Sequence, residues 1–302
     1  MTDLSIVILS WNTRDLLQAC LESLFHGPRS LDYEVIVVDN ASEDGSADMT
    51  ASRFPRALLI RNDRNEGYAR GNNLGILRSG GRYILLLNSD TEVRGDAPER
   101  MTAFLEEHPE YGACAPKLVN PDGTIQRACM RFPTLAVPFF FDTFLERLFP
   151  ENRVVRRYFM RDFDHTQSRD VEQPPGSCFL FRSSLVSSVG LLDEDLFLFY
   201  NDVDYCKRIR EAGLKIRYIA EVEVMHHLGG STRKYGDFSL EWHKNRVRYF
   251  RKHHGFPGAW AAKCGATLRA VEEVIRCRKA GCALRSPEVR HILGILREVL
   301  KS

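Results

Sequence analysis

The stretch Tyr83–Asp90 constrains the fold more than any other part of the sequence. Five apolar residues, Tyr83 to Leu87, follow the pair Gly80-Gly81 and run directly into Asn88-Ser89-Asp90. A short apolar run between turn residues is typical of a strand that is buried on both faces of a parallel sheet. Ligands of such sheets bind beyond the carboxyl ends of the strands. We therefore expect the Asp90 carboxylate at a ligand site, where it would hold Mg²⁺ or Mn²⁺ against phosphate oxygens. The alternative is that Asp90 only begins a turn.

Strands and helices alternate through the segment that precedes Asp90. Apolar runs predict strands at Leu4–Ser10, Tyr33–Asp39 and Ala57–Ile60, and the second of these also ends in a carboxylate. Apolar residues at helical spacing predict a helix from the N-cap Thr13 to about His26. Such alternation is typical of a parallel sheet with covering helices, so the predicted fold class is α/β.

The composition is typical of a globular protein, and the charges are distributed unevenly along the chain. Of its 302 residues, 44% are hydrophobic and 27% are charged, and no apolar run reaches the ~18 residues of a membrane span. We expect no signal peptide, because the N-terminus lacks a basic segment, and we expect a cytoplasmic protein with reduced cysteines. Residues 231–302 hold 16 Lys and Arg against 6 Asp and Glu, whereas residues 1–230 hold 26 against 34. A basic C-terminal part faces anionic lipid, nucleic acid or only water.

The polar loop Asn65–Asn73 contains two glycines and leads into a predicted helix. Backbone N–H groups at such a junction would approach an anion, and Arg70 would pair with phosphate. The alternative is that the glycines are needed only for the backbone conformation. The loop matches neither the Walker A pattern nor the GxGxxG pattern.

Further candidate residues lie in the second half of the chain. Asp202 and Asp204 stand near the start of a predicted helix, where the helix dipole favours carboxylates, and capping is the simpler role for Asp204. His226-His227 precede a Gly-rich turn, an unusual place for core histidines. Residues 135–160 are aromatic and then basic, which suits a flap, a lipid-facing surface or a core helix.

Helical patterns at 240–254, 261–280 and 287–300 end the chain. They either pack on the rest of the chain or bind in the plane of a membrane. A nucleic-acid role is disfavoured, because the basic tail lacks the interleaved aromatic residues of single-strand binders.

Five blocks in order resemble family 2 glycosyltransferases, in particular the bacterial rhamnosyltransferase-like branch. These blocks are Ser5–Asn12, Val37–Ser46, Asn65–Gly75 with Leu86–Asp90, Gly176–Arg182, and Asp193–Arg210 with His226–Thr232. The resemblance covers roughly residues 3–255. It implies a GT-A fold with a nucleotide-sugar half (1–95), an acceptor half (96–235) and a C-terminal helical extension (236–302).

The resemblance also implies roles for individual residues. Ser10, Asn12 and Asp39 would line the nucleoside pocket, with Asp39 receiving the base. Arg70, Asn72 and Asn88 would lie along the diphosphate.

The metal site and the base come from the same resemblance. Asp90 matches the last acid of the family's DxD-type metal motif, whose first position here is Asn88. His226 would complete the metal site, with His227 as the second choice. Asp202 matches the catalytic base, and Asn201 stands before it where relatives commonly have Glu.

Transfer of a sugar from a nucleoside diphosphate requires a base for the acceptor hydroxyl and positive charge at the leaving group. A single base without a second nucleophilic carboxylate fits inversion. The predicted function is therefore an inverting, Mg²⁺- or Mn²⁺-dependent glycosyltransferase. Its partners would be a nucleoside-diphosphate sugar, with rhamnose suggested by the resemblance, and a glycan or polyprenyl-linked acceptor in cell-surface polysaccharide synthesis. We expect it in the cytoplasm, with peripheral contact at the inner face of the plasma membrane.

Two other functions stay open from the sequence. A nucleotidyltransferase also uses a parallel sheet, a metal and phosphates, but it would favour a basic Gly-rich segment after the first strand, where this chain has Trp11-Asn12-Thr13. A non-catalytic module that binds nucleotide sugars would tolerate Asn88 and Asn201.

Overall fold

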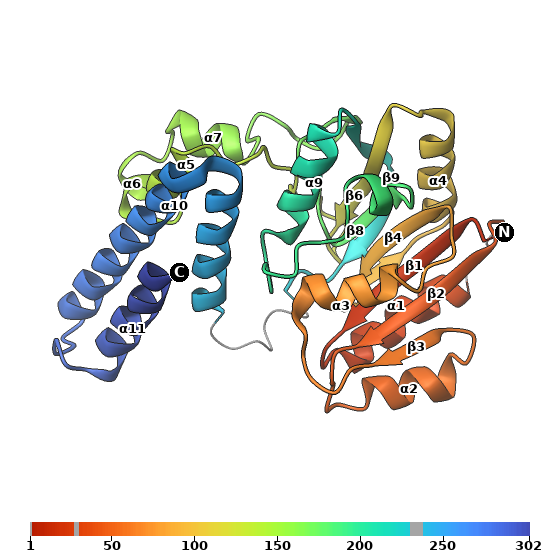
Figure 1. Cartoon of the computed structure of the whole chain (residues 1–302), viewed down its shortest axis with the longest axis horizontal. Helices are drawn as coiled ribbons and strands as arrows, with labels where there is room; N and C mark the ends of the chain where they lie inside the picture. Colours follow the sequence, from red (N-terminus) through yellow and green to blue (C-terminus); the bar gives the residue numbers. More distant parts are fainter. Residues whose placement is uncertain (1, 27–29, 230–237) are drawn as a thin grey trace. The chain divides into compact units, whose positions relative to one another are not determined.

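A computed structural model describes residues 2–26, 30–229 and 238–302 of the chain (Figure 1). The chain divides into two compact units. Unit 1 comprises Met1–Met130, Phe163–Glu194 and Asn201–Gly236, and unit 2 comprises Arg131–Asp162, Asp195–Tyr200 and Asp237–Ser302. The predicted boundary at residue 235, and residues 230–232 of the last sequence block, lie outside the described residues. The division into 1–95, 96–235 and 236–302 stays a prediction.

Unit 1 is built on one mixed sheet with strand order β3-β2-β1-β4-β8-β6-β9-β5, and β7 pairs with β9. The strands of the parallel part are β1 Leu4–Ser10, β2 Tyr33–Asp39, β3 Leu58–Arg61 and β4 Tyr83–Asn88. The remaining strands are β5 Thr91–Val93, β6 Tyr111–Val119, β7 Arg169–Asp170, β8 Cys178–Arg182 and β9 Lys215–His226. The four predicted N-terminal strands are therefore present.

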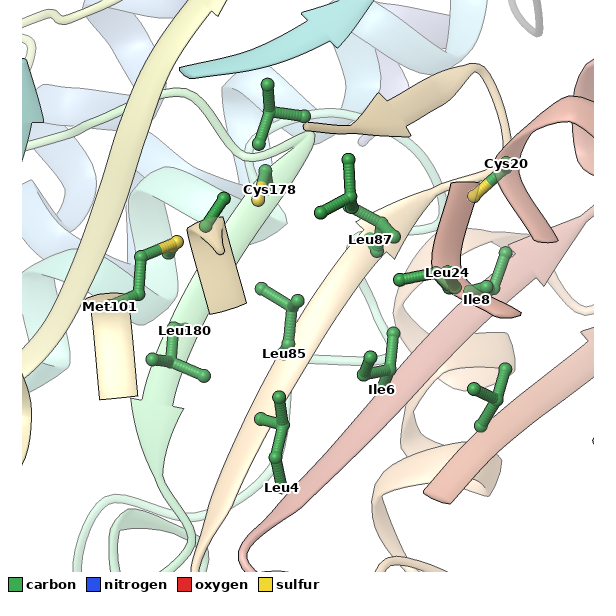
Figure 2. Packing of buried hydrophobic residues seen from close by; sticks show 14 of the residues in the cluster. Leu4, Ile6, Ile8, Cys20, Leu24, Leu85, Leu87, Met101, Cys178 and Leu180 are labelled. Carbon is green, nitrogen blue, oxygen red and sulfur yellow. The ribbon is translucent and has the colours of Figure 1, made fainter. Parts of the chain in front are cut away.

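Helices cover both faces of this sheet. They are α1 Arg14–Phe25, α2 Ser46–Arg53, α3 Gly67–Ile76, α4 Ala97–Glu107, α8 Leu185–Ser188 and α9 Asn201–Glu211. Alternate residues of a strand point to opposite faces, so Leu4, Ile6 and Ile8 of β1 pack on one side. Figure 2 shows them beside Leu24 of α1 and Leu85 of β4.

The other face of β1 explains two glycines of α3. A Cβ at Gly71 would lie 2.4 Å from the Leu9 side chain, and one at Gly75 would lie 2.3 Å from Val7. These glycines let the helix approach the sheet closely. Of the two glycines in the loop Asn65–Asn73, this packing accounts for Gly71, whereas Gly67 has a positive φ of 81°.

Unit 2 is helical. Its helices are α5 Val137–Phe140, α6 Phe144–Leu148, α7 Arg153–Tyr158, α10 Ser239–Lys279 and α11 Pro287–Lys301. Figure 1 shows α11 folded back along the second half of α10. The predicted break between 254 and 261 is a kink: only Gly255 has non-helical angles (φ 64°), and Pro257 follows in the first turn of the next segment, where proline is tolerated. None of the described helices contains a stretch that is long and apolar enough to cross a bilayer.

Candidate active site

The three predicted nucleoside residues lie at the carboxyl ends of β1 and β2, and two of them, Asn12 and Asp39, share one hydrogen-bond network. The register pairs Ser10 with Asp39, so both strands end at the same level. Asp39 is buried, and its Oδ2 accepts a hydrogen bond from the backbone N–H of Ser42 at 3.0 Å. The Ser42 hydroxyl accepts from the N–H of Asn12 at 2.9 Å, and Asn12 Oδ1 accepts from the N–H of Glu43 at 2.8 Å. Asn12 itself has a positive φ of 55°, which asparagine tolerates better than most residues.

A row of hydroxyl groups joins the ends of β1 and β4. Ser10 Oγ lies 3.0 Å from Thr13 Oγ1, which donates to Ser89 Oγ at 2.9 Å. The predicted helix α1 does begin after Thr13, but the predicted side-chain cap is wrong, because the Thr13 hydroxyl bonds to these two serines instead of the helix backbone. Sequence reasoning missed Thr13 and Ser89 as members of this edge.

Asp90 and His226 are brought together by strand pairing. β5 pairs with β9 in the register Thr91 to His226, which sets Asp90 beside the imidazole. His226 Nε2 lies 3.4 Å from Asp90 Oδ1, and both side chains are buried. Gln126 contacts the opposite edge of the ring, where its Oε1 lies 2.8 Å from His226 Nδ1.

The hydrogen bonds of Gln126 fix the tautomer of His226. Its amide nitrogen donates to Asn120 Oδ1 at 2.7 Å and to the carbonyl of His226 at 2.8 Å, so Oε1 is the acceptor for Nδ1–H. With Nδ1–H donated to Gln126, Nε2 is the ring nitrogen that faces the Asp90 carboxylate and is available to a cation. The Asp90 carboxylate and His226 Nε2 face each other, and Gln126 orients the imidazole from its other side, which is a favourable arrangement for binding a cation.

His227 lies in a different setting from His226. Its Nε2 is 2.7 Å from Glu92 Oε1, and its backbone N–H donates to the carbonyl of Asp90 at 2.8 Å. The geometry therefore favours His226 as the histidine of the predicted metal site.

The residues predicted to approach the diphosphate are spread over α3 and β4. Arg70 is exposed and pairs with Glu66 at 3.4 Å. Asn72 is buried and donates to the carbonyl of Tyr68 at 2.9 Å, on another side of the helix, since residues two apart lie about 200° apart. The structure does not bring these two side chains together. The carbonyl of Asn88 accepts from the Thr91 hydroxyl at 2.6 Å.

Asn40 anchors the loop before α3, a contribution that sequence reasoning missed. Its amide nitrogen donates to Asn65 Oδ1 at 2.8 Å, and its Oδ1 accepts from Asn62 Nδ2 at 2.9 Å and from the N–H of Glu66 at 3.0 Å. A single buried amide thus ties the end of β2 to the start of α3.

Asp202 begins α9 in close contact with Gly176. A Cβ at position 176 would lie 2.9 Å from Asp202 Oδ2, so only glycine leaves this carboxylate undisturbed. Burial raises the pKa of Asp202, while hydrogen bonds from the Val203 N–H and the Gln173 side chain act in the opposite direction. The Tyr68 hydroxyl, 3.4 Å from the Gly176 carbonyl, lines the same small cavity as Asp202.

Tyr68 links the two acids electrostatically. Burial raises its pKa most, and the charges of Asp202 and Asp90 raise it further. Asp204, by contrast, is fully buried and accepts from Arg208 Nε at 2.9 Å, an ion pair within α9. The two acids of α9 therefore stand in different settings: Asp204 is held in an ion pair, and Asp202 lines the cavity.

The described residues contain no group of three or more His, Cys, Asp or Glu side chains that could hold a metal ion. Asp90 and His226 fit a divalent cation that shares its remaining positions between substrate phosphates and water, as Mg²⁺ usually does.

Residues 5–189 match the family model for glycosyl transferase family 2. The chain belongs to this family. Membership decides between the two enzyme classes that the sequence left open, in favour of glycosyl transfer and against nucleotidyl transfer.

Two proteins that are similar to this family 2 glycosyltransferase are rhamnosyltransferases. N-acetylglucosaminyl-diphospho-decaprenol L-rhamnosyltransferase of Mycobacterium tuberculosis is 27% identical over 282 residues, which are 89% of this chain and 90% of the relative. The dTDP-rhamnosyl transferase RfbF of Shigella flexneri is 23% identical over 74% of this chain and 69% of its own. The prediction of a rhamnosyltransferase-like enzyme of polysaccharide synthesis is confirmed at this level.

The fold has solved relatives. Mannosyltransferase PcManGT from Pyrobaculum calidifontis, in complex with GDP-Man and Mn²⁺, matches 100% of this chain and 88% of its own, with a TM-score of 0.56 and 16% identity. At this identity the likeness concerns the fold alone. The predicted GT-A fold is confirmed.

Proposed function

We propose that this family 2 glycosyltransferase transfers a sugar, with inversion, from a nucleoside diphosphate to a lipid-linked glycan. The observation that carries the proposal is the placement of Asp202 and Asp90 at neighbouring points of unit 1: Asp202 contacts Gly176, and the N–H of Asn88, two residues before Asp90, donates to the carbonyl of Ser177 at 2.9 Å. Asp202 lines a small cavity with Tyr68, and Asp90 faces His226 at 3.4 Å. A base and a phosphate-binding group in one site are the two requirements of this reaction.

Asp39 supports a donor nucleotide whose base carries a ring N–H, as uracil, thymine and guanine do. Its Oδ1 is buried and has no hydrogen-bond partner within the described ranges, while Oδ2 accepts from Ser42. A buried carboxylate oxygen of this kind is stabilised by an N–H donor, and the ring N–H of uracil or thymine is such a donor. The relative named a dTDP-rhamnosyl transferase supports a thymidine nucleotide carrying rhamnose.

Asp90 and His226 would hold Mg²⁺ or Mn²⁺. When bound, a divalent cation supplies positive charge that stabilises the diphosphate as it leaves. The solved mannosyltransferase, which was determined with Mn²⁺, supports a metal in this fold. Gln126 keeps the ring of His226 in the orientation that this role requires.

Asp202 acts as the general base. It takes the proton of the acceptor hydroxyl while that oxygen forms a bond to the anomeric carbon, and the bond from this carbon to the diphosphate oxygen breaks. The nucleoside diphosphate departs with the bonding electrons. Burial keeps Asp202 basic, because a raised pKa strengthens its affinity for the proton. Attack from the face opposite the leaving group gives inversion.

The name of a relative supports an acceptor at the membrane. The mycobacterial relative is named for an N-acetylglucosaminyl-diphospho-decaprenol acceptor, and it covers most of this chain. We assign a polyprenyl-linked glycan as acceptor and a peripheral location at the inner face of the plasma membrane.

Donor binding is the decisive test. The melting temperature of the full chain is measured with UDP, dTDP, GDP and their sugars, each with and without Mn²⁺. A ligand that binds only the folded state raises this temperature. We expect a Mn²⁺-dependent shift with a pyrimidine nucleotide and release of that nucleotide when a lipid-linked acceptor is added. Binding without release on any acceptor would favour the non-catalytic module, and no binding at all would overturn the proposal.

A further inference from the structure

Exposed large apolar side chains gather in unit 2. The second half of α10 carries the most prominent set: Phe256, Trp260, Val271 and Ile275 are 82%, 57%, 51% and 50% exposed. At 100° per residue these four positions fall within an arc of about 100°. They form a stripe about 28 Å long at 1.5 Å per residue.

The opposite side of the same helix is the one that packs inside unit 2. Ala259, Ala262, Ala266 and Ala270 are buried, and a Cβ at Gly265 would lie 2.1 Å from the carbonyl oxygen of Pro138. The helix is therefore apolar on two sides, with small residues towards its own unit and large ones towards the outside. Packing within the unit accounts only for the small ones.

Two neighbouring segments contact α10 near the stripe. Arg147 of α6 forms an ion pair with Glu272, next to Val271, and the exposed side chains of Leu148 and Phe149 follow Arg147 directly. At the kink, the ring of Phe139 lies 6.3 Å from that of Trp260. We call the stripe formed by Phe256, Trp260, Val271 and Ile275 the α10 face.

The charge around the α10 face is positive. Residues 251–279 contain seven Lys and Arg against two Glu. Both glutamates are engaged by arginines: Glu272 by Arg147 and Arg276, and Glu273 by Arg269 at 2.8 Å. A linear apolar stripe with Trp and Phe and a basic surround is the pattern of a helix that lies in a membrane interface.

We propose that the α10 face docks on a bilayer with anionic headgroups, its aromatic residues at headgroup level and α10 parallel to the membrane plane. The charge selects this occupant over a second copy of the chain, because two copies facing each other would bring like charges together, whereas anionic lipid is complementary. The inference deepens the proposed function, which places the acceptor in the membrane, by naming the surface that would hold the enzyme there.

Vesicle co-sedimentation of the full chain tests the proposal. We expect binding to vesicles with about 30 mol % phosphatidylglycerol, weaker binding to pure phosphatidylcholine, and partial release by salt. The double variant F256S/W260S should reduce binding at least about tenfold. The control L58S/L77S removes two leucines of unit 1 that are 48% and 64% exposed, and it should bind as the unchanged protein does.

Fluorescence gives a second, site-specific readout. Brominated lipids should quench Trp260 on binding, and the quenching should fall in W260F. Unchanged sedimentation of F256S/W260S would overturn the proposal. The proposal would also be overturned if the unchanged protein formed a dimer that F256S/W260S does not form, and if neither protein bound vesicles. The nucleotide-dependent melting shift reports on the proposed function separately, since F256S/W260S should retain it in full.

Discussion

Nε2 of His226 lies 3.4 Å from Oδ1 of Asp90, because the pairing of β5 with β9 sets Thr91 opposite His226. The neighbouring His227 pairs with Glu92 instead. We therefore predict that H226A abolishes the Mn²⁺-dependent part of the nucleotide melting shift, while H227A leaves it nearly unchanged. Thermal shift with and without Mn²⁺ measures both, and equal losses in the two variants would contradict the assignment.

Gln126 acts through His226 and not on the substrate. Replacing it by leucine in Q126L removes the acceptor for Nδ1–H and frees the ring to turn. Loss of such a supporting hydrogen bond typically lowers metal affinity about 10- to 100-fold. The midpoint of a Mn²⁺ titration at saturating nucleotide measures the effect, and Q126E, which keeps an acceptor at this position, should recover most of it.

Asp202 and Asp204 are two residues apart in α9 but have different surroundings: Asp202 lines a small cavity, and Asp204 is buried in an ion pair. D202N should lower kcat about 10²- to 10⁴-fold, the usual contribution of a general base, with nucleotide binding retained. D204N is the matched control: it breaks a buried ion pair with Arg208 and should cost about 3 kcal/mol of unfolding free energy. Its kcat per folded molecule should stay near that of the unchanged enzyme. Weakened nucleotide binding by D202N would instead make Asp202 a ligand.

The raised pKa of Asp202 predicts a pH dependence with a definite sign. Since the folded pKa lies above the unfolded value, the folded state holds this proton longer, and stability falls as the pH rises through the folded pKa. D202N should therefore melt higher than the unchanged protein at pH 8, with a smaller difference at pH 4. The kcat/KM of the unchanged enzyme should fall as the pH drops through the same pKa. A melting difference that is constant over pH would contradict the raised pKa.

Gly176 allows the Asp202 carboxylate to occupy its position, because it has no side chain there. In G176A, the new Cβ would lie 2.9 Å from Asp202 Oδ2 and would displace the carboxylate. Because misplacement by about 1 Å can cost a reaction 10²-fold, we expect kcat to fall by about that factor with little change in nucleotide affinity. G123A, in a turn where a Cβ would meet nothing within 4 Å, serves as a control for expression and activity, although its positive φ adds some strain.

The sequence by itself determined the N-terminal half of the sheet and the acids at its edge. Continuous apolar runs such as Tyr83–Leu87 have few alternatives to a buried strand, and a polar residue directly after such a run must lie at the strand end. Asp39 and Asp90 were located in this way. The resemblance of five ordered blocks added His226 and Asp202, and the family that it implies is confirmed.

Only the tertiary structure decided which side chains support these residues. Gln126 reaches His226 across 100 positions, and Gly176 meets Asp202 through the packing of separate elements, so no local pattern contains either contact. The same holds for α10. Its sequence shows apolar residues at helical spacing on two sides, but whether Ala262 or Trp260 is buried depends on what packs against the helix, and that is a property of the folded unit.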